Sequence, residues 1–138
     1  MLTLNKAKSI GMQTCPICGC VQKEKMGTGD ICNCCGNELG FDDVHTKEET
    51  ISYFCRNNIQ ILYDIAPEAK EYEMNEYLPR TTLQKFLRLN WIKNKYKRKY
   101  MNKIFWNSKK AIKQLENIGI DVDEQMKKKA LDVTCYKI

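Results

Sequence analysis

The sequence predicts an α+β protein, with a small β-hairpin module over residues 13–45 packed as one compact domain on a mainly α-helical unit over residues 46–138. Two short cysteine repeats lie close together near the start of the chain, and apolar residues recur at helical spacing over most of the remainder. No flexible linker separates the two parts. With 138 residues, of which 43% are apolar, the chain is long enough to bury one modest core.

The cysteine repeats carry the strongest chemical signal. Six of the eight cysteines lie within 21 positions, and they include two C-x-x-C-G motifs, which we call the first and second knuckle. The knuckles are Cys15-Pro16-Ile17-Cys18-Gly19 and Cys32-Asn33-Cys34-Cys35-Gly36. Two residues between thiolates let both sulfurs point to one centre, and the following glycine lets the backbone turn tightly beside them. The 13 residues between Cys18 and Cys32 are enough for a hairpin that brings the knuckles together.

The two knuckles predict one structural zinc ion held by Cys15, Cys18, Cys32 and Cys35, and therefore a small four-cysteine zinc ribbon. Because the first ten residues do not resemble a secretory signal, we expect a reducing, cytoplasmic location, where clustered cysteines more often bind metal than form disulfides. Iron is the competing metal, since it also accepts tetrahedral sulfur. Free or redox-active cysteines are the alternative to a metal site. Cys20 and Cys34 are surplus, and either could replace a ligand.

Catalysis is not predicted, because four thiolates close the zinc shell whereas a catalytic zinc keeps one position open. The chain holds one histidine, His45, and it lacks H-E-x-x-H and Gly-rich phosphate-binding motifs. We expect His45 to be an exposed loop residue. We expect Asp42 and Asp43 to cap or solvate a turn.

The remaining chain is predicted to be helical. Thr46 and Glu49 form a capping-box pattern, and Cys55 falls in the apolar stripe of the helix that follows. Glycine and proline positions mark several ends. The expected helices cover residues 46–65, residues 68–78, Thr81 or Thr82 to about residue 99, Asn107 or Ser108 to Gly119, and a last helix capped by Asp121 with Glu124.

Charge is unevenly divided along the chain. Residues 1–79 hold 7 basic and 12 acidic groups, whereas residues 80–138 hold 16 basic and 5 acidic groups. Basic and aromatic residues alternate most densely over residues 91–100. This run is compatible with a nucleic-acid surface, with a surface for an acidic protein, or with a solvated helix face. The candidate binding residues are Trp91, Lys93, Lys95, Lys97, Arg98 and Lys99.

The two knuckles and the segment Leu39-Gly40-Phe41-Asp42-Asp43 that follows them resemble the bacterial cysteine-rich CPCC family of small zinc-ribbon-like proteins. A looser similarity includes Trp91-Ile92-Lys93-Asn94 and Trp106-Asn107 followed by Gln114-Leu115-Glu116-Asn117-Ile118. Ile17 departs from the family pattern, which places a third cysteine there, and residues 50–80 look inserted. The resemblance covers about half the chain. It implies zinc and, by analogy only, an immunity or regulatory factor that blocks a partner by binding it.

The sequence therefore predicts a non-catalytic zinc-binding interaction protein that acts by binding a protein partner. Nucleic-acid binding through residues 91–100 is the alternative. The acidic segment 68–78 and the basic C-terminal half offer surfaces of opposite charge for such a partner. No membrane association and no small-molecule substrate are inferred.

Overall fold

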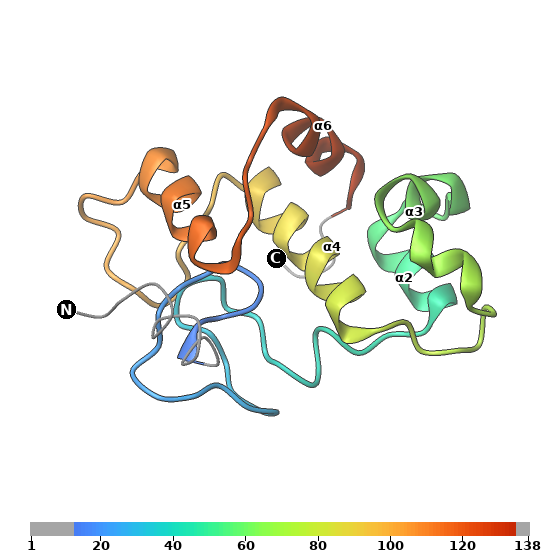
Figure 1. Cartoon of the computed structure of the whole chain (residues 1–138), viewed down its shortest axis with the longest axis horizontal. Coiled ribbons are helices and arrows are strands. Elements are labelled where there is room, and N and C mark those ends of the chain that lie inside the picture. Colours follow the sequence, from blue (N-terminus) through green and yellow to red (C-terminus); the bar gives the residue numbers. More distant parts are fainter. Residues whose placement is uncertain (1–12, 135–138) are drawn as a thin grey trace.

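The computed structural model describes residues 13–134. Over these residues the chain is helical, and the knuckle segment forms loops against one side of the helices (Figure 1). None of the described helices is long and apolar enough to cross a membrane. The elements are α2 Lys47–Phe54, α3 Ile59–Ile65, the 3-10 helix η2 Pro67–Glu71, α4 Arg80–Lys93, α5 Ser108–Leu115, the 3-10 helix η3 Glu116–Ile118 and α6 Glu124–Asp132.

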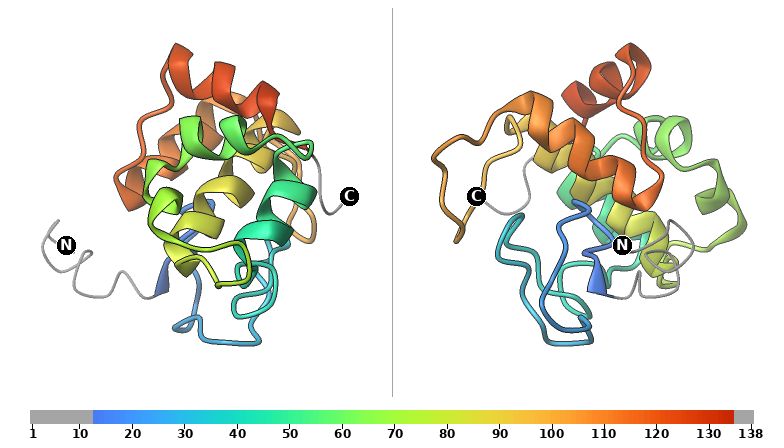
Figure 2. Two further views of the ribbon diagram at one scale, coloured as in Figure 1. Left: turned by 90° about the vertical axis from the view of Figure 1, so that its right-hand side faces the viewer. Right: turned by 60° about the vertical axis from the view of Figure 1, so that its left-hand side comes forward.

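Helix α4 is the central element. The knuckle loops lie on one side of α4 and α6 lies on the opposite side, as the views of Figures 1 and 2 agree. Half of its 14 residues are buried, among them Leu83, Phe86 and Leu87. The ring of Phe86 packs against that of Phe54 from α2, with centroids 5.8 Å apart. This helix therefore joins the apolar core to the knuckle segment.

The predicted β-hairpin zinc ribbon is wrong, because residues 13–134 contain isolated bridges but no strand or sheet. The Thr14–Val21 and Ile31–Glu38 bridges each close one knuckle on itself rather than pairing the two knuckles. The connecting residues 23–30 lack the alternating apolar pattern of a strand, and they turn at Gly27 and Gly29. Each knuckle therefore makes its bridge within itself and not with the other knuckle.

The helix predicted over residues 46–65 is two helices. The capping box of Thr46 and Glu49 is confirmed, with both of its hydrogen bonds present. Arg56 and Asn57 then adopt the left-handed region with φ of 54° and 58°, which no α-helix accommodates. The Asn58 side chain accepts a hydrogen bond from the Gln60 amide and starts α3. Local hydrogen bonding by asparagine thus overrides the apolar spacing.

The acidic helix predicted over residues 68–78 is also wrong beyond its first turn, since only η2 forms there. The chain after η2 instead pairs with the start of α2. The Lys47 amide donates to the Glu76 carbonyl and the Leu78 amide donates to the His45 carbonyl. This pairing holds the end of the segment against the start of α2 and places Pro79 before α4.

Helix α4 ends at Lys93, six residues before the predicted end. Lys95 and Tyr96 have φ of 60° and 58°, and the Trp91 indole donates to the Lys97 carbonyl at 3.0 Å. The chain therefore folds back over the end of α4 instead of continuing it.

The last two helices follow the predicted signals more closely. Asn107 caps α5 by accepting from the Lys110 amide, and Gly119 ends that region with φ of 73°. The cap of α6 is Asp123, which accepts from the Met126 amide, rather than the predicted Asp121. Both helices were thus predicted correctly, and the start of α6 lies two residues later than predicted.

Candidate metal centre

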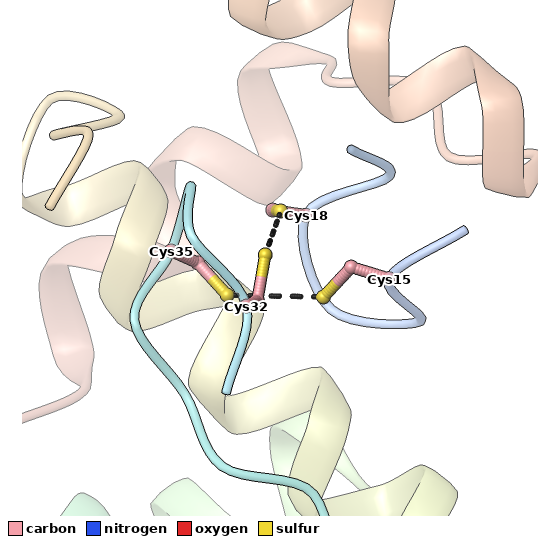
Figure 3. A group of neighbouring side chains, drawn as sticks. All are labelled: Cys15, Cys18, Cys32 and Cys35. Carbon is pink, nitrogen blue, oxygen red and sulfur yellow. Dashed lines mark hydrogen bonds between the residues drawn. The ribbon is translucent and has the colours of Figure 1, made fainter. Parts of the chain in front are cut away.

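The four predicted ligand residues lie together. The Sγ atoms of Cys15, Cys18, Cys32 and Cys35 are all within 4.8 Å of one another (Figure 3). The Cys15–Cys35 and Cys18–Cys32 sulfur pairs are 3.8 Å and 3.6 Å apart. A tetrahedral shell with metal–sulfur bonds of about 2.3 Å requires sulfurs about 3.8 Å apart. The cluster therefore has the size of a four-sulfur metal site.

Two glycines shape the knuckles. The Gly19 amide donates to the Cys15 carbonyl at 2.9 Å and the Gly36 amide donates to the Cys32 carbonyl at 2.8 Å. Both glycines have positive φ, 80° and 78°, in the region that disfavours residues with a Cβ atom. A Cβ on Gly19 would also lie 2.4 Å from the carbonyl oxygen of Gln114. The motif glycine thus permits both the turn and the close approach of α5.

Side chains from two helices and the turn after α5 hold the first knuckle. Arg88 of α4 donates to the carbonyls of Pro16 and Ile17 at 2.7 and 2.9 Å. Gln114 of α5 donates to the Cys18 carbonyl at 3.0 Å. Asn117 of η3 donates to the Gly19 carbonyl, also at 3.0 Å. The helical unit therefore positions the backbone that carries two of the four thiols.

Backbone contacts hold the second knuckle. The Lys99 amide donates to the Cys34 carbonyl and the Tyr100 amide donates to the Asn33 carbonyl, both at 2.9 Å. The sequence did not predict that any of these residues supports a knuckle, and Lys99 was expected to bind a partner. The only feature of the sequence that pointed to Gln114 and Asn117 was their place in the looser family resemblance. No sequence feature pointed to Arg88, because it lies about 70 positions from the carbonyls that it bonds.

The thiols cannot all ionise without a cation. Contact with the Cys15 thiol is the leading cause that raises the pKa of Cys18 and of Cys35 and lowers that of Cys32. The cluster thus shares protons unequally, as closely coupled groups do. A bound cation would stabilise all four thiolates at once, and the sulfur-only donor set fits a tetrahedral metal ion.

Arg88 supplies positive charge beside the cluster. Burial lowers its pKa, whereas Cys15 and Cys18 raise it. A guanidinium stays protonated under these opposing effects. A site of net charge −2, made from four thiolates and a divalent ion, would therefore have a buried partner of opposite sign.

The remaining cysteines differ in their surroundings. Cys20 and Cys34 are buried next to the cluster, at 6% and 0% exposure. Cys55 lies in the core at the end of α2, as expected, and burial raises its pKa to about 12. Cys135 lies outside the described residues.

The expectation of an exposed His45 is wrong. Its side chain is buried against the edges of the Tyr53 and Phe54 rings, at centroid distances of 5.3 and 6.1 Å. Burial is the leading cause that lowers its pKa. Residues 45–47 hydrogen-bond with residues 76–78, and His45 is buried beside this pairing. The sequence around His45 does not reveal a contact with residues so far along the chain.

Asp42 and Asp43 cap the turn that follows the second knuckle. Their carboxylates accept from the amides of Glu38 and Gly40 at 2.7 and 2.6 Å. Asp43 also accepts from Arg80 at 3.0 Å and from Gln84 at 2.9 Å. Both carboxylates are buried, so they join the knuckle segment to the start of α4 rather than face solvent.

The six candidate binding residues do not form one exposed face. Trp91 is only 4% exposed, so its indole cannot stack on a ligand base. Lys93 donates to the Val133 carbonyl at 2.6 Å, and the Arg98 guanidinium lies 3.8 Å from the centroid of the Trp106 ring. The exposed members are Lys95, Lys97 and Lys99.

The exposed aromatic residues lie further along the same loop. We call residues 94–107, between α4 and α5, the basic loop. Tyr100, Ile104 and Phe105 are 61%, 67% and 81% exposed. The loop residues have no helical or strand period from which to predict the aromatic residues that turn inward. Only the fold distinguishes exposed Phe105 from half-buried Trp106.

Comparisons with protein-family models, curated proteins and solved structures give no match. The fold and the site therefore define the class on their own: a helical protein with a cysteine cluster of metal-binding size. The similarity to CPCC proteins stays a prediction from motifs.

Proposed function

We propose that the cluster of Cys15, Cys18, Cys32 and Cys35 binds one structural Zn²⁺. The sulfur–sulfur distances of 3.6 and 3.8 Å support this proposal, because they match a tetrahedral zinc–thiolate shell. Zinc would hold two loops that have no sheet of their own. Iron is the competing occupant, and metal analysis of protein purified without added metal distinguishes the two.

The zinc site is proposed to be non-catalytic. Four sulfur ligands fill the shell, so no position remains for a water or a substrate. Three of the four thiols are fully buried. The ion would act on the protein alone, by fixing the backbone of both knuckles.

We infer that the protein acts by binding a protein partner through the basic loop. This inference depends on one observation: Tyr100, Ile104 and Phe105 are exposed among lysines, while the inner side of the loop is bonded to the second knuckle. Aromatic anchors within a charged rim are typical of protein interfaces. The lysines select an acidic partner, whose activity the protein would block or regulate as immunity-like factors do.

Site-specific photo-crosslinking in the host tests this function. A photoreactive phenylalanine analogue at position 105 should yield a protein adduct, which the Lys103→Glu substitution should abolish. The same analogue at Tyr77, which is 63% exposed in the segment before α4, is the matched control. Equal adducts at both positions, or an adduct that survives Lys103→Glu, would contradict the assignment.

Nucleic acid is the second candidate partner. Lys99 lies 5.7 Å from the centroid of the Tyr100 ring and Lys110 lies 5.6 Å from that of Phe105. Exposed rings beside lysines are also the groups that stack on single-stranded bases and contact phosphate. A salt titration with single-stranded RNA tests it: affinity should fall steeply with salt, and no binding at low salt would exclude this candidate.

A further inference from the structure

The basic loop is held by both parts of the molecule. The Trp91 indole of α4 donates to the Lys97 carbonyl at 3.0 Å. The Trp106 indole donates to the Tyr96 carbonyl at 2.8 Å, which joins the two ends of the loop. Between these ends, residues 99–101 are held by the knuckle segment instead. The course of the loop therefore depends on the helical unit at its ends and on the knuckles at its middle.

The middle of the loop bonds directly to the second metal-binding turn. The Lys99 amide donates to the Cys34 carbonyl and the Tyr100 amide donates to the Asn33 carbonyl, both at 2.9 Å. Asn33 and Cys34 are the two residues enclosed between the proposed ligands of the second knuckle. The two acceptor carbonyls therefore keep their positions only while this turn keeps its shape.

Side chains of the same stretch also pack on the cysteine turns. The methylene groups of Lys99 lie over Gly36, since a Cβ atom at Gly36 would be 2.5 Å from the Lys99 Cδ. The thioether sulfur of Met101 lies 3.7 Å from the Cys20 sulfur. Residues 99–101 thus contact the knuckle segment through both backbone and side chains.

The ring of Phe105 is presented by a strained backbone. Phe105 is the most exposed of the three large apolar side chains on this loop, at 81%, and its φ of 64° lies in the left-handed region. Residues with a Cβ atom disfavour this region, so the conformation persists only where flanking contacts impose it. One such contact is the bond from the Ile104 amide to the Asn102 side chain at 2.8 Å. Residues 99–101 lead directly into this stretch, so their release would remove a restraint that holds Phe105 outward.

We propose that the metal centre controls the basic loop, so that the chain binds its acidic partner only while the four cysteines hold an ion. The inference rests on the proposed function, both for the zinc and for the partner. Without an ion the second knuckle loses the centre that fixes its turn, and the amides of Lys99 and Tyr100 lose their acceptors. Exposed apolar side chains on a loosened loop bind more weakly, because binding must then order them.

Hydrogen exchange of the full-length protein, followed by NMR before and after a chelator removes the metal, tests this coupling. The Lys99 and Tyr100 amides should lose their protection when the metal is removed. The Tyr96 amide donates to the Trp91 carbonyl at 2.9 Å, so it is the internal control and should stay protected. Equal protection of Lys99 and Tyr100 in both states would overturn the proposal. Protein that never holds a metal ion would instead remove the proposed zinc site.

A variant separates the loop contact from the metal itself. Lys99→Pro removes the amide that donates to Cys34 and leaves every cysteine in place. Lys99→Gln is the matched control, because it removes the same charge and keeps the amide. Both variants should hold as much zinc as the parent chain and keep its circular dichroism spectrum.

Photo-crosslinking from position 105 then reads out the partner. Lys99→Pro should lower the yield of the partner adduct about 10-fold relative to Lys99→Gln, the order expected for the loss of one or two hydrogen bonds. A chelator should lower the yield from the parent chain in the same way. Equal yields from the two variants would overturn the proposal and leave the partner function intact. No adduct from the parent chain would remove the partner function itself.

Discussion

The knuckle segment, residues 13–45, and the helical unit, residues 46–134, are stabilised by different means. The large apolar side chains that the knuckle segment buries are Ile17, Met26 and Leu39, and most of its other buried positions are cysteines and short polar residues. The helical unit buries rings and leucines, including Phe54 and Phe86. One part has an apolar core, and the other depends on a metal centre and on hydrogen bonds from its neighbour. The knuckle loops can therefore hold a defined geometry without a sheet.

Loss of the metal should give the largest difference in stability between the two regions. Zinc contributes about 10–16 kcal/mol to the folding of small zinc peptides, so Cys15→Ser or Cys32→Ser should unfold the knuckles. Hydrogen exchange should show loss of amide protection over residues 13–45 and retained protection in α4. Cys55→Ser is the matched control and should keep its zinc content. Equal zinc loss in all three variants would contradict the ligand assignment.

A substitution in the apolar core should destabilise the helical unit and leave the metal centre intact. Phe86→Ala removes a fully buried ring that packs on Phe54, and it should cost about 3–5 kcal/mol of unfolding free energy. Denaturant unfolding measures the loss. Metal content at low denaturant should be unchanged, since no ligand is altered. A Phe86→Ala protein that folds normally but cannot hold metal would show that the two regions are not distinct.

The junction between the regions should give an intermediate effect. Arg88→Gln removes the guanidinium bonds to the Pro16 and Ile17 carbonyls and the positive charge beside the thiolates. Such supporting groups are typically worth about 10–100-fold in metal affinity. Competition with a chelator measures this change. Lys85→Gln on the same helix is the control, because Lys85 pairs with Glu68 instead, and an equal loss there would indicate a general charge effect.

The last effect is absent at neutral pH and develops only in alkaline solution. Burial raises the pKa of Cys55 from 9.0 to about 12, so the unfolded chain loses this proton first. The contribution of the neutral thiol is complete below pH 9.0 and falls as pH rises from there toward about 12. Unfolding free energy should therefore decline over this range more in the parent chain than in Cys55→Ala. If the unfolding free energies of the parent chain and of Cys55→Ala fall in parallel with pH, the raised pKa of Cys55 is contradicted.

Sequence reasoning succeeded where a short motif is sufficient. The spacing of the two knuckles identified the four cysteines that the fold brings together, and the capping signals of Thr46, Asn107 and Gly119 located helix boundaries. These features depend on residues close in sequence. The C-x-x-C-G pattern contains its own turn, so it survives a wrong prediction of the surrounding sheet.

The errors concern contacts between distant residues. A hairpin was expected because the 13 residues between Cys18 and Cys32 are enough for one, but here side chains of Arg88 and Gln114 hold the first knuckle in place. Trp91 was counted among the binding residues because it precedes a basic run, although its spacing also places it on the core side of its helix, and the structure buries it. His45 became buried through pairing with residues about 30 positions later. Local composition carries no information on such pairings.

X-ray absorption at the metal edge of the purified full-length protein tests the metal centre most directly. We expect zinc surrounded only by sulfur, at about 2.3 Å. A shell that contains nitrogen or oxygen at about 2.0–2.2 Å, or protein that is folded over residues 13–45 without any metal, would contradict a structural centre built from Cys15, Cys18, Cys32 and Cys35.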